Sequence, residues 1–382
     1  MKVLSLLFIA LLSPIQTVAS PFLVAPPPPI SAHAYLLLDF HSGKVLMEKN
    51  ADERVEPASL TKLMAAYLVF QKISTGKIKL TDTVIISEKA WRMTGSRMYL
   101  EVDSRVSVEL LLKGMIIQSG NDASLALAEF VGGTEEAFAT LMNEQAQRLG
   151  LTNTHYTNST GLPDEQHYSS ARDTARLAQA LIQDFPEYYR WYSERDFTYN
   201  SITQYNRNRL LRRPPSVAGM EVDGMKTGYT EAAGYCLVAS ARLGEMRLIS
   251  VVMGTKNEKS RTRMAEKMLD YGFRFFETYR LYKALDPIDT ERVWQGHISQ
   301  LQLGLSEPLY VTVPNGDYEP LKAILRIDKY IMAPVNAFEP QGTLEIRLGG
   351  GVISSRPVVA LSSVEKGSLW KRLIDSFLLL FY

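Results

Sequence analysis

The stretch from Pro57 to Phe70 constrains the fold of this chain more than any other. After Lys62 the residues LMAAYLVF are all apolar or aromatic, so a helix here would be apolar on every face. Such a helix has to be buried on all sides, and the rest of the chain must be organised around it. Ser59 lies at its start, and Lys62 follows three residues later on the same face.

The pair of Ser59 and Lys62 is suited to nucleophilic catalysis. A serine hydroxyl needs a neighbouring base, and a lysine serves as that base only when burial or nearby positive charge lowers its pKa. The electropositive helix start and the apolar surroundings favour this state. The pattern alone is weak, because Ser-x-x-Lys also begins at Ser74, Ser363 and Ser368. A capping serine followed by a surface lysine is the simpler interpretation.

Length and composition predict two domains of ordinary globular type. The chain has 382 residues, of which 46% are apolar, and this is enough for two large cores and a short appendage. A formal net charge of +1 argues against a nucleic-acid partner. The single cysteine, Cys236, excludes an intrachain disulfide. The five histidines show no metal-binding spacing, so we expect neither a metal nor another cofactor.

The first residues are typical of a secretory signal peptide. Lys2 precedes a nearly unbroken apolar run, and small residues end at Ala19, so we assign residues 1–19 to the signal and expect export. An uncleaved anchor is the alternative, although the apolar core is short for a bilayer. Residues 20–30 contain consecutive prolines and predict an extended spacer.

Residues 31–281 predict an α+β domain in which helices flank an antiparallel sheet. Two strands joined at residues 41–43 form a hairpin, and three strands between Val222 and Met253 form a meander. Helical segments occupy much of the chain between them, and another helix follows the meander. Strands from both ends of this region can therefore join one sheet.

The chain changes character after Tyr282. Short alternating strands with turn residues between them predict a small all-β domain, a sandwich or barrel, over residues 282–362. Residues 363–382 predict an amphipathic helix, with bulky apolar residues on one face and charged residues on the other. We expect this helix to lie on a membrane surface, with docking against its own protein as the alternative.

Two further motifs place polar residues where the secondary structure breaks. Ser119 and Asn121 occupy a break between two helical segments, in the only Ser-x-Asn of the chain. Lys226, Thr227 and Gly228 end a strand and form the only Lys-Thr-Gly, in which the glycine leaves room beside the backbone. Taken alone, the first motif is equally consistent with a capping loop and the second with a strand edge carrying a surface lysine.

Together the motifs indicate acyl transfer through a serine ester. Ser59 would attack a carbonyl while Lys62 takes its proton, and Ser119 would pass a proton to the leaving amine. Asn121 would hold the substrate amide. Lys226 would keep the site positive and help to lower the pKa of Lys62.

The negative charge that develops on the attacked carbonyl needs two preorganised donors. The backbone N–H of Ser59, at the helix start, is one candidate. The other is the backbone N–H of Tyr229, which directly follows the Lys-Thr-Gly motif.

This combination resembles the D-alanyl-D-alanine carboxypeptidases among the low-molecular-mass penicillin-binding proteins, for which the three motifs are an established signature. The similarity runs from about residue 31 to the end and includes PASLTKLM, QSGNDA and VDGMKTG. It implies a β-lactamase- or transpeptidase-like catalytic domain, a C-terminal β domain and a membrane-anchoring helix. It also implies removal of the terminal D-Ala from peptidoglycan pentapeptides through a Ser59 acyl-enzyme, and covalent inhibition by β-lactams. The expected location is the periplasmic face of the bacterial inner membrane.

The resemblance also implies how the free carboxylate of the substrate is bound. Thr227 and an arginine after the meander have this role in similar proteins, and Arg261 is the matching position. Arg207 matches a second basic residue of the family's site. A solvated surface arginine is the alternative for each. The chain departs from many relatives at Tyr229, where they carry histidine.

Three other functions share part of the pattern. A D,D-endopeptidase that cuts peptidoglycan cross-links would use the same machinery. A class A β-lactamase also needs a carboxylate base in a Glu-x-x-Leu-Asn setting, which the sequence lacks. A non-catalytic wall-binding protein would not require Ser59, Lys62 and Lys226.

Overall fold

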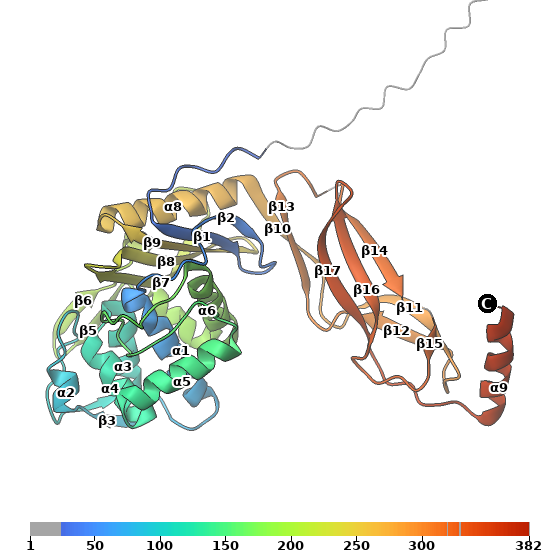
Figure 1. The fold of residues 1–382 in the computed structure, drawn as a ribbon, viewed down its shortest axis with the longest axis horizontal. Coiled ribbons are helices and arrows are strands. Elements are labelled where there is room, and N and C mark those ends of the chain that lie inside the picture. Colours follow the sequence, from blue (N-terminus) through green and yellow to red (C-terminus); the bar gives the residue numbers. More distant parts are fainter. Residues whose placement is uncertain (1–23, 319, 328–329, 382) are drawn as a thin grey trace, which may run out of the picture.

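The structure, a computed structural model, describes residues 24–381 except 319, 328 and 329. The predicted signal peptide, residues 1–19, and the start of the spacer lie outside the described residues. Figure 1 shows a larger body of helices around a sheet, an elongated body of strands, and a helix at the C-terminal end. This arrangement confirms the predicted fold class, an α+β domain followed by an all-β domain and a terminal helix.

An antiparallel sheet lies at the centre of the larger body. Its strands are β1 (Ala34–Asp39), β2 (Val45–Lys49), β7 (Glu221–Thr230), β8 (Gly234–Leu243) and β9 (Met246–Thr255). They pair in the order β2-β1-β9-β8-β7, so strands from both ends of this region meet in one sheet, as predicted. The strand that carries the Lys-Thr-Gly motif forms an edge of this sheet.

Helices cover both faces of the sheet (Figure 1). They are α1 (Lys62–Ser74), α2 (Glu88–Trp91), α3 (Val108–Lys113), α4 (Asn121–Gly132), α5 (Glu135–Arg148), α6 (Ala171–Asp184), α7 (Pro186–Tyr189) and α8 (Glu258–Phe275). Side chains alternate along β1, so Leu36 and Leu38 join the core around α1, whereas Leu37 joins the core beneath α8.

Short elements complete this body and shape the surface near the sheet edge. Two small antiparallel pairs are formed by β3 (Thr83–Ile85) with β4 (Arg105–Ser107), and by β5 (Asp196–Tyr199) with β6 (Ile202–Tyr205). Single helical turns are η1 (Ala58–Thr61), η2 (Gly114–Gln118), η3 (Arg190–Ser193) and η4 (Arg209–Arg212). The first two turns lead directly into α1 and toward α4, which carry motif residues.

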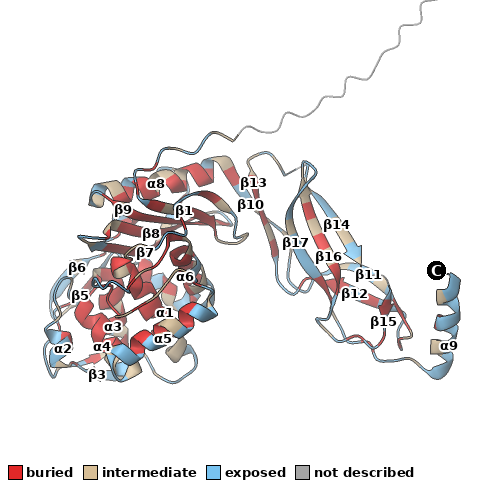
Figure 2. Ribbon diagram, in the orientation of Figure 1, coloured by how far each residue is buried: buried red, intermediate tan, exposed pale blue. Residues whose placement is uncertain are grey.

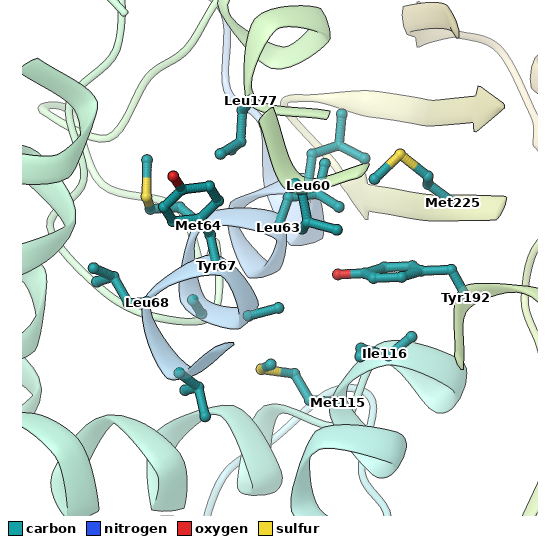
Figure 3. Close-up of a cluster of buried hydrophobic side chains, with 14 of the residues drawn as sticks. Leu60, Leu63, Met64, Tyr67, Leu68, Met115, Ile116, Leu177, Tyr192 and Met225 are labelled. Atoms are coloured by element: carbon teal, nitrogen blue, oxygen red, sulfur yellow. The ribbon is translucent and has the colours of Figure 1, made fainter. Parts of the chain in front are cut away.

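Helix α1 is the buried helix that the sequence predicted. Every residue from Lys62 to Phe70 is buried (Figure 2), and apolar side chains from several elements surround the helix (Figure 3). Ser59 itself lies in the 3₁₀ turn η1, and among the described residues no side chain caps either η1 or α1. The simpler interpretation of a capping serine with a surface lysine is therefore wrong.

The C-terminal body consists of strands, as predicted. These are β10 (Phe276–Tyr282), β11 (Pro287–Trp294), β12 (Gln300–Gly304), β13 (Leu309–Pro314), β14 (Lys322–Ile327), β15 (Ile331–Met332), β16 (Pro340–Leu348) and β17 (Gly351–Ala360). One sheet has the order β14-β16-β17-β12-β11-β15, and β10 pairs with β13. Residues 276–281, assigned to the catalytic region from the sequence, thus pair with the β body, which favours a boundary near 276.

A polar junction fastens the two bodies together. Helix α8 ends at Phe275 and β10 begins at Phe276, so the chain passes directly from one body into the other. The buried carboxylate of Asp39 accepts a hydrogen bond from the Thr278 hydroxyl at 2.7 Å. Lys44 Nζ donates to the backbone oxygen of Thr312 at 3.0 Å.

The terminal helix α9 (Leu369–Leu378) uses its polar face to contact the β body. Asp375 is buried and accepts hydrogen bonds from the backbone N–H of Gln295 at 2.7 Å and from Arg292 at 3.3 Å. The apolar face points to solvent (Figure 2), with Trp370 77% and Phe377 62% exposed. The helix thus docks on its own protein, as the alternative stated, but through its polar face, and the apolar face is left uncovered. Among the described helices, none has the length and hydropathy needed to span a membrane.

Candidate active site

The three sequence motifs meet at a pocket of about 220 Å³ beside the edge of the sheet. Its lining consists of Ser59, Gly95, Ser96, Ser119, Asn121, Thr160, Gly161, Leu162, Arg207, Thr227, Gly228, Tyr229, Thr230 and Arg261. All predicted site residues except Lys62 and Lys226 belong to this lining, and these two lysines hydrogen-bond to residues of it. Segments separated by more than 150 residues in the chain are thus brought to one place.

Ser59 and Lys62 are in hydrogen-bond contact. Lys62 Nζ donates to Ser59 Oγ at 3.0 Å, to Asn121 Oδ1 at 2.8 Å and to the backbone oxygen of Thr160 at 2.6 Å. The 3₁₀ turn explains the alignment, because its three residues per turn place side chains i and i+3 one above the other. Three acceptors hold the amine in one position, and only 1% of the residue is exposed.

Burial prepares the Lys62 amine to accept a proton. The pKa of Lys62 is lowered from 10.5 to about 7, mainly by loss of hydration on burial; the negative charge of Asp122 opposes this shift, and the positive charge of Arg207 adds to it. We expected Lys226 to disfavour the positive charge of Lys62; the two lysines do repel each other electrostatically, and Arg207 adds a further positive charge near Lys62. The pKa of Lys226 is itself held well below its usual range by burial first, and then by its cationic neighbours Lys62, Arg207 and Arg261.

Lys226 and Ser119 form a second amine–hydroxyl pair. Lys226 Nζ donates to Ser119 Oγ at 2.7 Å and to the backbone oxygen of Thr227 at 2.9 Å. Ser119 has a left-handed backbone, with φ of 70°, between η2 and α4. Non-glycine residues rarely adopt this conformation, and functional sites are where such strain is usually retained.

Asn121 is engaged at both ends of its amide. Its Oδ1 accepts the Lys62 hydrogen bond, and its Nδ2 donates to the backbone oxygen of Thr94 at 2.7 Å. The Thr94 contact fixes which end of the amide faces the lysine. Holding Lys62 is therefore a direct structural task of Asn121, in addition to the substrate contact expected from the sequence.

The edge strand β7 lies against η1 at Gly228. A Cβ atom on this glycine would lie 3.0 Å from the backbone oxygen of Pro57 and 3.2 Å from the backbone nitrogen of Ser59. The room that glycine leaves is thus used by the protein's own backbone. Tyr229 follows with 53% of its surface exposed and its ring 4.2 Å from that of Tyr235, centroid to centroid.

Arg261 and Arg207 reach the pocket from different elements. Arg261, on α8, is buried and donates to the backbone oxygen of Gly228 at 3.1 Å, and it pairs with Glu258 at 3.3 Å. The alternative of a solvated surface arginine is therefore wrong for Arg261. Arg207 follows β6, and its Nε donates to the backbone oxygen of Gln118 at 3.0 Å although the residue is exposed.

A glycine turn that the sequence analysis did not single out supplies the third acceptor for Lys62. Asn158 Oδ1 accepts from the backbone N–H of Thr160 at 3.1 Å and of Gly161 at 2.7 Å, which shapes the turn. Gly161 has a φ of 82°, and a Cβ there would lie 1.8 Å from the backbone oxygen of Ala58. Only glycine fits this position. An asparagine three residues before a glycine was the available turn signal.

Two other buried polar residues support the site without having been predicted. The Asp122 carboxylate accepts from the backbone N–H groups of residues 98, 99 and 100, and so holds that loop against α4. His167 Nδ1 accepts from the backbone N–H of Thr157 at 3.1 Å, so its Nε2 carries the proton and donates to Thr61 Oγ1 at 2.8 Å. Thr61 lies between the two catalytic candidates of the first motif.

Comparison with known proteins gives consistent similarities along the chain. The family model described as D-alanyl-D-alanine carboxypeptidase matches residues 21–257, and that of the penicillin-binding protein 5 C-terminal domain matches residues 276–366. The D-alanyl-D-alanine carboxypeptidase DacC of Escherichia coli (strain K12) is 46% identical over 362 residues, which are 93% of this chain and 90% of that protein.

Two solved structures show the same similarity in three dimensions. Penicillin binding protein 5 from Haemophilus influenzae superposes with a TM-score of 0.85 at 42% identity, over 90% of this chain and 100% of that chain. Penicillin-Binding Protein D2 from Listeria monocytogenes, in its ampicillin-bound form, has a TM-score of 0.59 at 30% identity. That match covers 65% of this chain and 100% of the other.

Proposed function

Since the chain belongs to the family of D-alanyl-D-alanine carboxypeptidases, we propose that it removes the terminal D-Ala of peptidoglycan stem pentapeptides through an acyl-enzyme on Ser59. The observation that carries this assignment is the buried Lys62 amine, 3.0 Å from the Ser59 hydroxyl, with a pKa lowered to about 7. An amine of this kind is neutral often enough at physiological pH to act as the base.

The proposed reaction begins with proton transfer from Ser59 to Lys62. Ser59 Oγ then forms a bond to the carbonyl carbon of the penultimate D-Ala, and the backbone N–H groups of Ser59 and Tyr229 stabilise the oxyanion. The C–N bond breaks, and the proton that Lys62 accepted passes to the leaving amine through Ser119, which Lys226 holds by its hydrogen bond, so that Lys62 is neutral again. Water hydrolyses the resulting ester, which releases the shortened peptide and restores Ser59.

We propose that the cationic side of the pocket selects substrates with a free terminal carboxylate. Arg261, Arg207 and Thr227 all line the pocket, and Arg261 is held in place by its bonds to Gly228 and Glu258. Arginine presents a planar fork of donors that matches a carboxylate. The same positive charge would attract the carboxylate of a penicillin, and a related protein has been solved with ampicillin bound.

Mass analysis after penicillin treatment tests the assignment. We expect one covalent adduct, mapped to the peptide that contains Ser59, and no adduct on a folded Ser59→Ala variant. Release of D-Ala from a soluble pentapeptide is the companion measurement. An adduct at another residue would refute the proposed nucleophile, and release only from cross-linked dimers would indicate a D,D-endopeptidase instead.

We further propose that the protein is exported and attached to the periplasmic face of the bacterial inner membrane through α9. Its apolar face is exposed while its polar face holds the β body, and such an orientation suits a helix lying in the membrane interface. Sedimentation with anionic phospholipid vesicles tests this. We expect a Trp370→Glu/Phe377→Glu variant to stay in solution, and an Ile85→Glu control on the catalytic body to sediment like the wild type. Equal sedimentation of all three would refute the anchor.

A further inference from the structure

The rim of the pocket beyond Arg207 carries exposed tyrosines covered by arginines. The Arg97 guanidinium lies over the Tyr99 ring, 5.4 Å from its centroid, and the Arg212 guanidinium lies over the Tyr205 ring at 5.1 Å. Tyr99 is 49% exposed and Tyr205 is 62% exposed, and both arginines are exposed as well. We call these four residues the arginine–tyrosine rim.

The rim is continuous with the pocket. Gln204 Nε2, on β6, donates to the backbone oxygen of Arg97 at 3.1 Å, which joins the two halves of the rim. Arg207 follows Tyr205 by two residues and lines the pocket. Gly95 and Ser96, immediately before Arg97, also line the pocket. The rim therefore borders the pocket beside Ser96 and Arg207, which both donate to the backbone oxygen of Gln118.

The two rim arginines carry charge that the protein does not neutralise. Within the part of the chain that the structure describes, no carboxylate lies within ion-pair distance of Arg97 or Arg212. Two arginines close to Arg212 in the sequence do form ion pairs: Arg209 pairs with Glu258 at 2.7 Å, and Arg213 pairs with Glu266 at 3.2 Å. Stacking on a tyrosine face orients a guanidinium and leaves its N–H edge free to bind an anion.

We infer that the arginine–tyrosine rim binds the carboxylates of neighbouring stem peptides when the substrate is polymeric peptidoglycan. This inference rests on the proposed function, because a substrate peptide that ends in a free carboxylate makes its polymer a polyanion. While one stem peptide occupies the pocket, others on the same polymer are held nearby at high effective concentration. Unpaired arginines beside the pocket are complementary in charge to these stems. The rim thus gives a preference for polymer over free peptide.

The test compares two substrates across three proteins. D-Ala release is measured from a soluble diacetylated Lys-D-Ala-D-Ala tripeptide and from purified pentapeptide-rich, uncross-linked peptidoglycan, each at low and at high salt. The proteins are the wild type, an Arg97→Gln/Arg212→Gln variant, and an Arg280→Gln/Arg356→Gln control. The control removes the same charge from exposed positions on the β body. Circular dichroism and penicillin labelling establish that each variant is folded.

We expect the rim variant to lose about fivefold in kcat/KM for the polymer, from two exposed charge contacts, and to keep wild-type kcat/KM for the tripeptide. Salt should reduce the wild-type preference for polymer toward that of the rim variant. An unchanged polymer preference in the rim variant would overturn the inference, as would an equal loss on both substrates. Failure of the wild type to act on the tripeptide would instead refute the proposed function.

Discussion

The rate at which penicillin acylates Ser59 should follow the titration of Lys62. With a pKa lowered by burial to about 7, about one tenth of the amine is neutral at pH 6 and about nine tenths at pH 8. Only the neutral amine can take the serine proton, so the second-order acylation rate should rise about tenfold over this interval and then level off. An amine with the ordinary pKa of 10.5 would give about a hundredfold rise and would still be climbing at pH 9.

Stopped-flow fluorescence with a fluorescent penicillin, at constant ionic strength from pH 5.5 to 9.5, measures this profile. The perturbation that tests its cause is Arg207→Gln. Arg207 lowers the pKa of Lys62 by its positive charge, so its removal should move the midpoint of the profile to higher pH. A change in penicillin affinity would alter the height of the profile and not this midpoint. Arg280→Gln, on the β body, should leave the midpoint in place. A profile that rises without a plateau, or a midpoint indifferent to Arg207, would refute the reasoning.

Two further predictions concern the support of the site. Gly161→Ala should lower the free energy of unfolding by about 3 kcal/mol, because its Cβ would lie 1.8 Å from the Ala58 oxygen. Gly150 also has a left-handed backbone but lies in open space, so Gly150→Ala should lower the free energy of unfolding by clearly less. Equal urea midpoints of the two variants would contradict this prediction. Burial lowers the pKa of His167 from 6.5 to about 4, so the unfolded state takes up a proton first as the pH falls. Stability should therefore drop by about 3 kcal/mol between pH 6.5 and 4, and a His167→Gln variant should show a flatter dependence in urea titrations.

The buried helix and the pairing of Ser59 with Lys62 could be predicted from the sequence because each rests on a strong local signal, whereas the contact between Lys226 and Ser119 was found only in the structure. A helix that is apolar on all sides must be buried in the core of a globular domain, and the motifs contain the reactive side chains themselves. The partners of Lys62 were harder to foresee. Thr160 contributes a backbone oxygen, which leaves no trace in side-chain identity, and Arg207 acts on the amine through space.

The sequence was less informative about where individual helices and strands begin and end. Sequence propensity does not distinguish a 3₁₀ turn from the first turn of an α-helix. Ser59 was therefore expected at the start of helix α1, whereas it lies in the preceding turn η1. The apolar aromatic pair Phe275 and Phe276 suits a helix end and a strand start equally, and tertiary pairing with β13 decides between them. The strand Gln300–Gly304 alternates as a strand should but is too short to stand out.

The direct passage from α8 into β10 limits how the enzyme can reach its substrate. No linker residues separate α8 from β10, and the buried Asp39 carboxylate hydrogen-bonds to Thr278 across the junction. We therefore expect less relative motion of the two bodies than a flexible linker would allow. If α9 rests on a membrane surface as proposed, the β body would set the distance between that surface and Ser59. A change in that distance would have to come from the strands of the β body or from residues 361–368, which join β17 to α9.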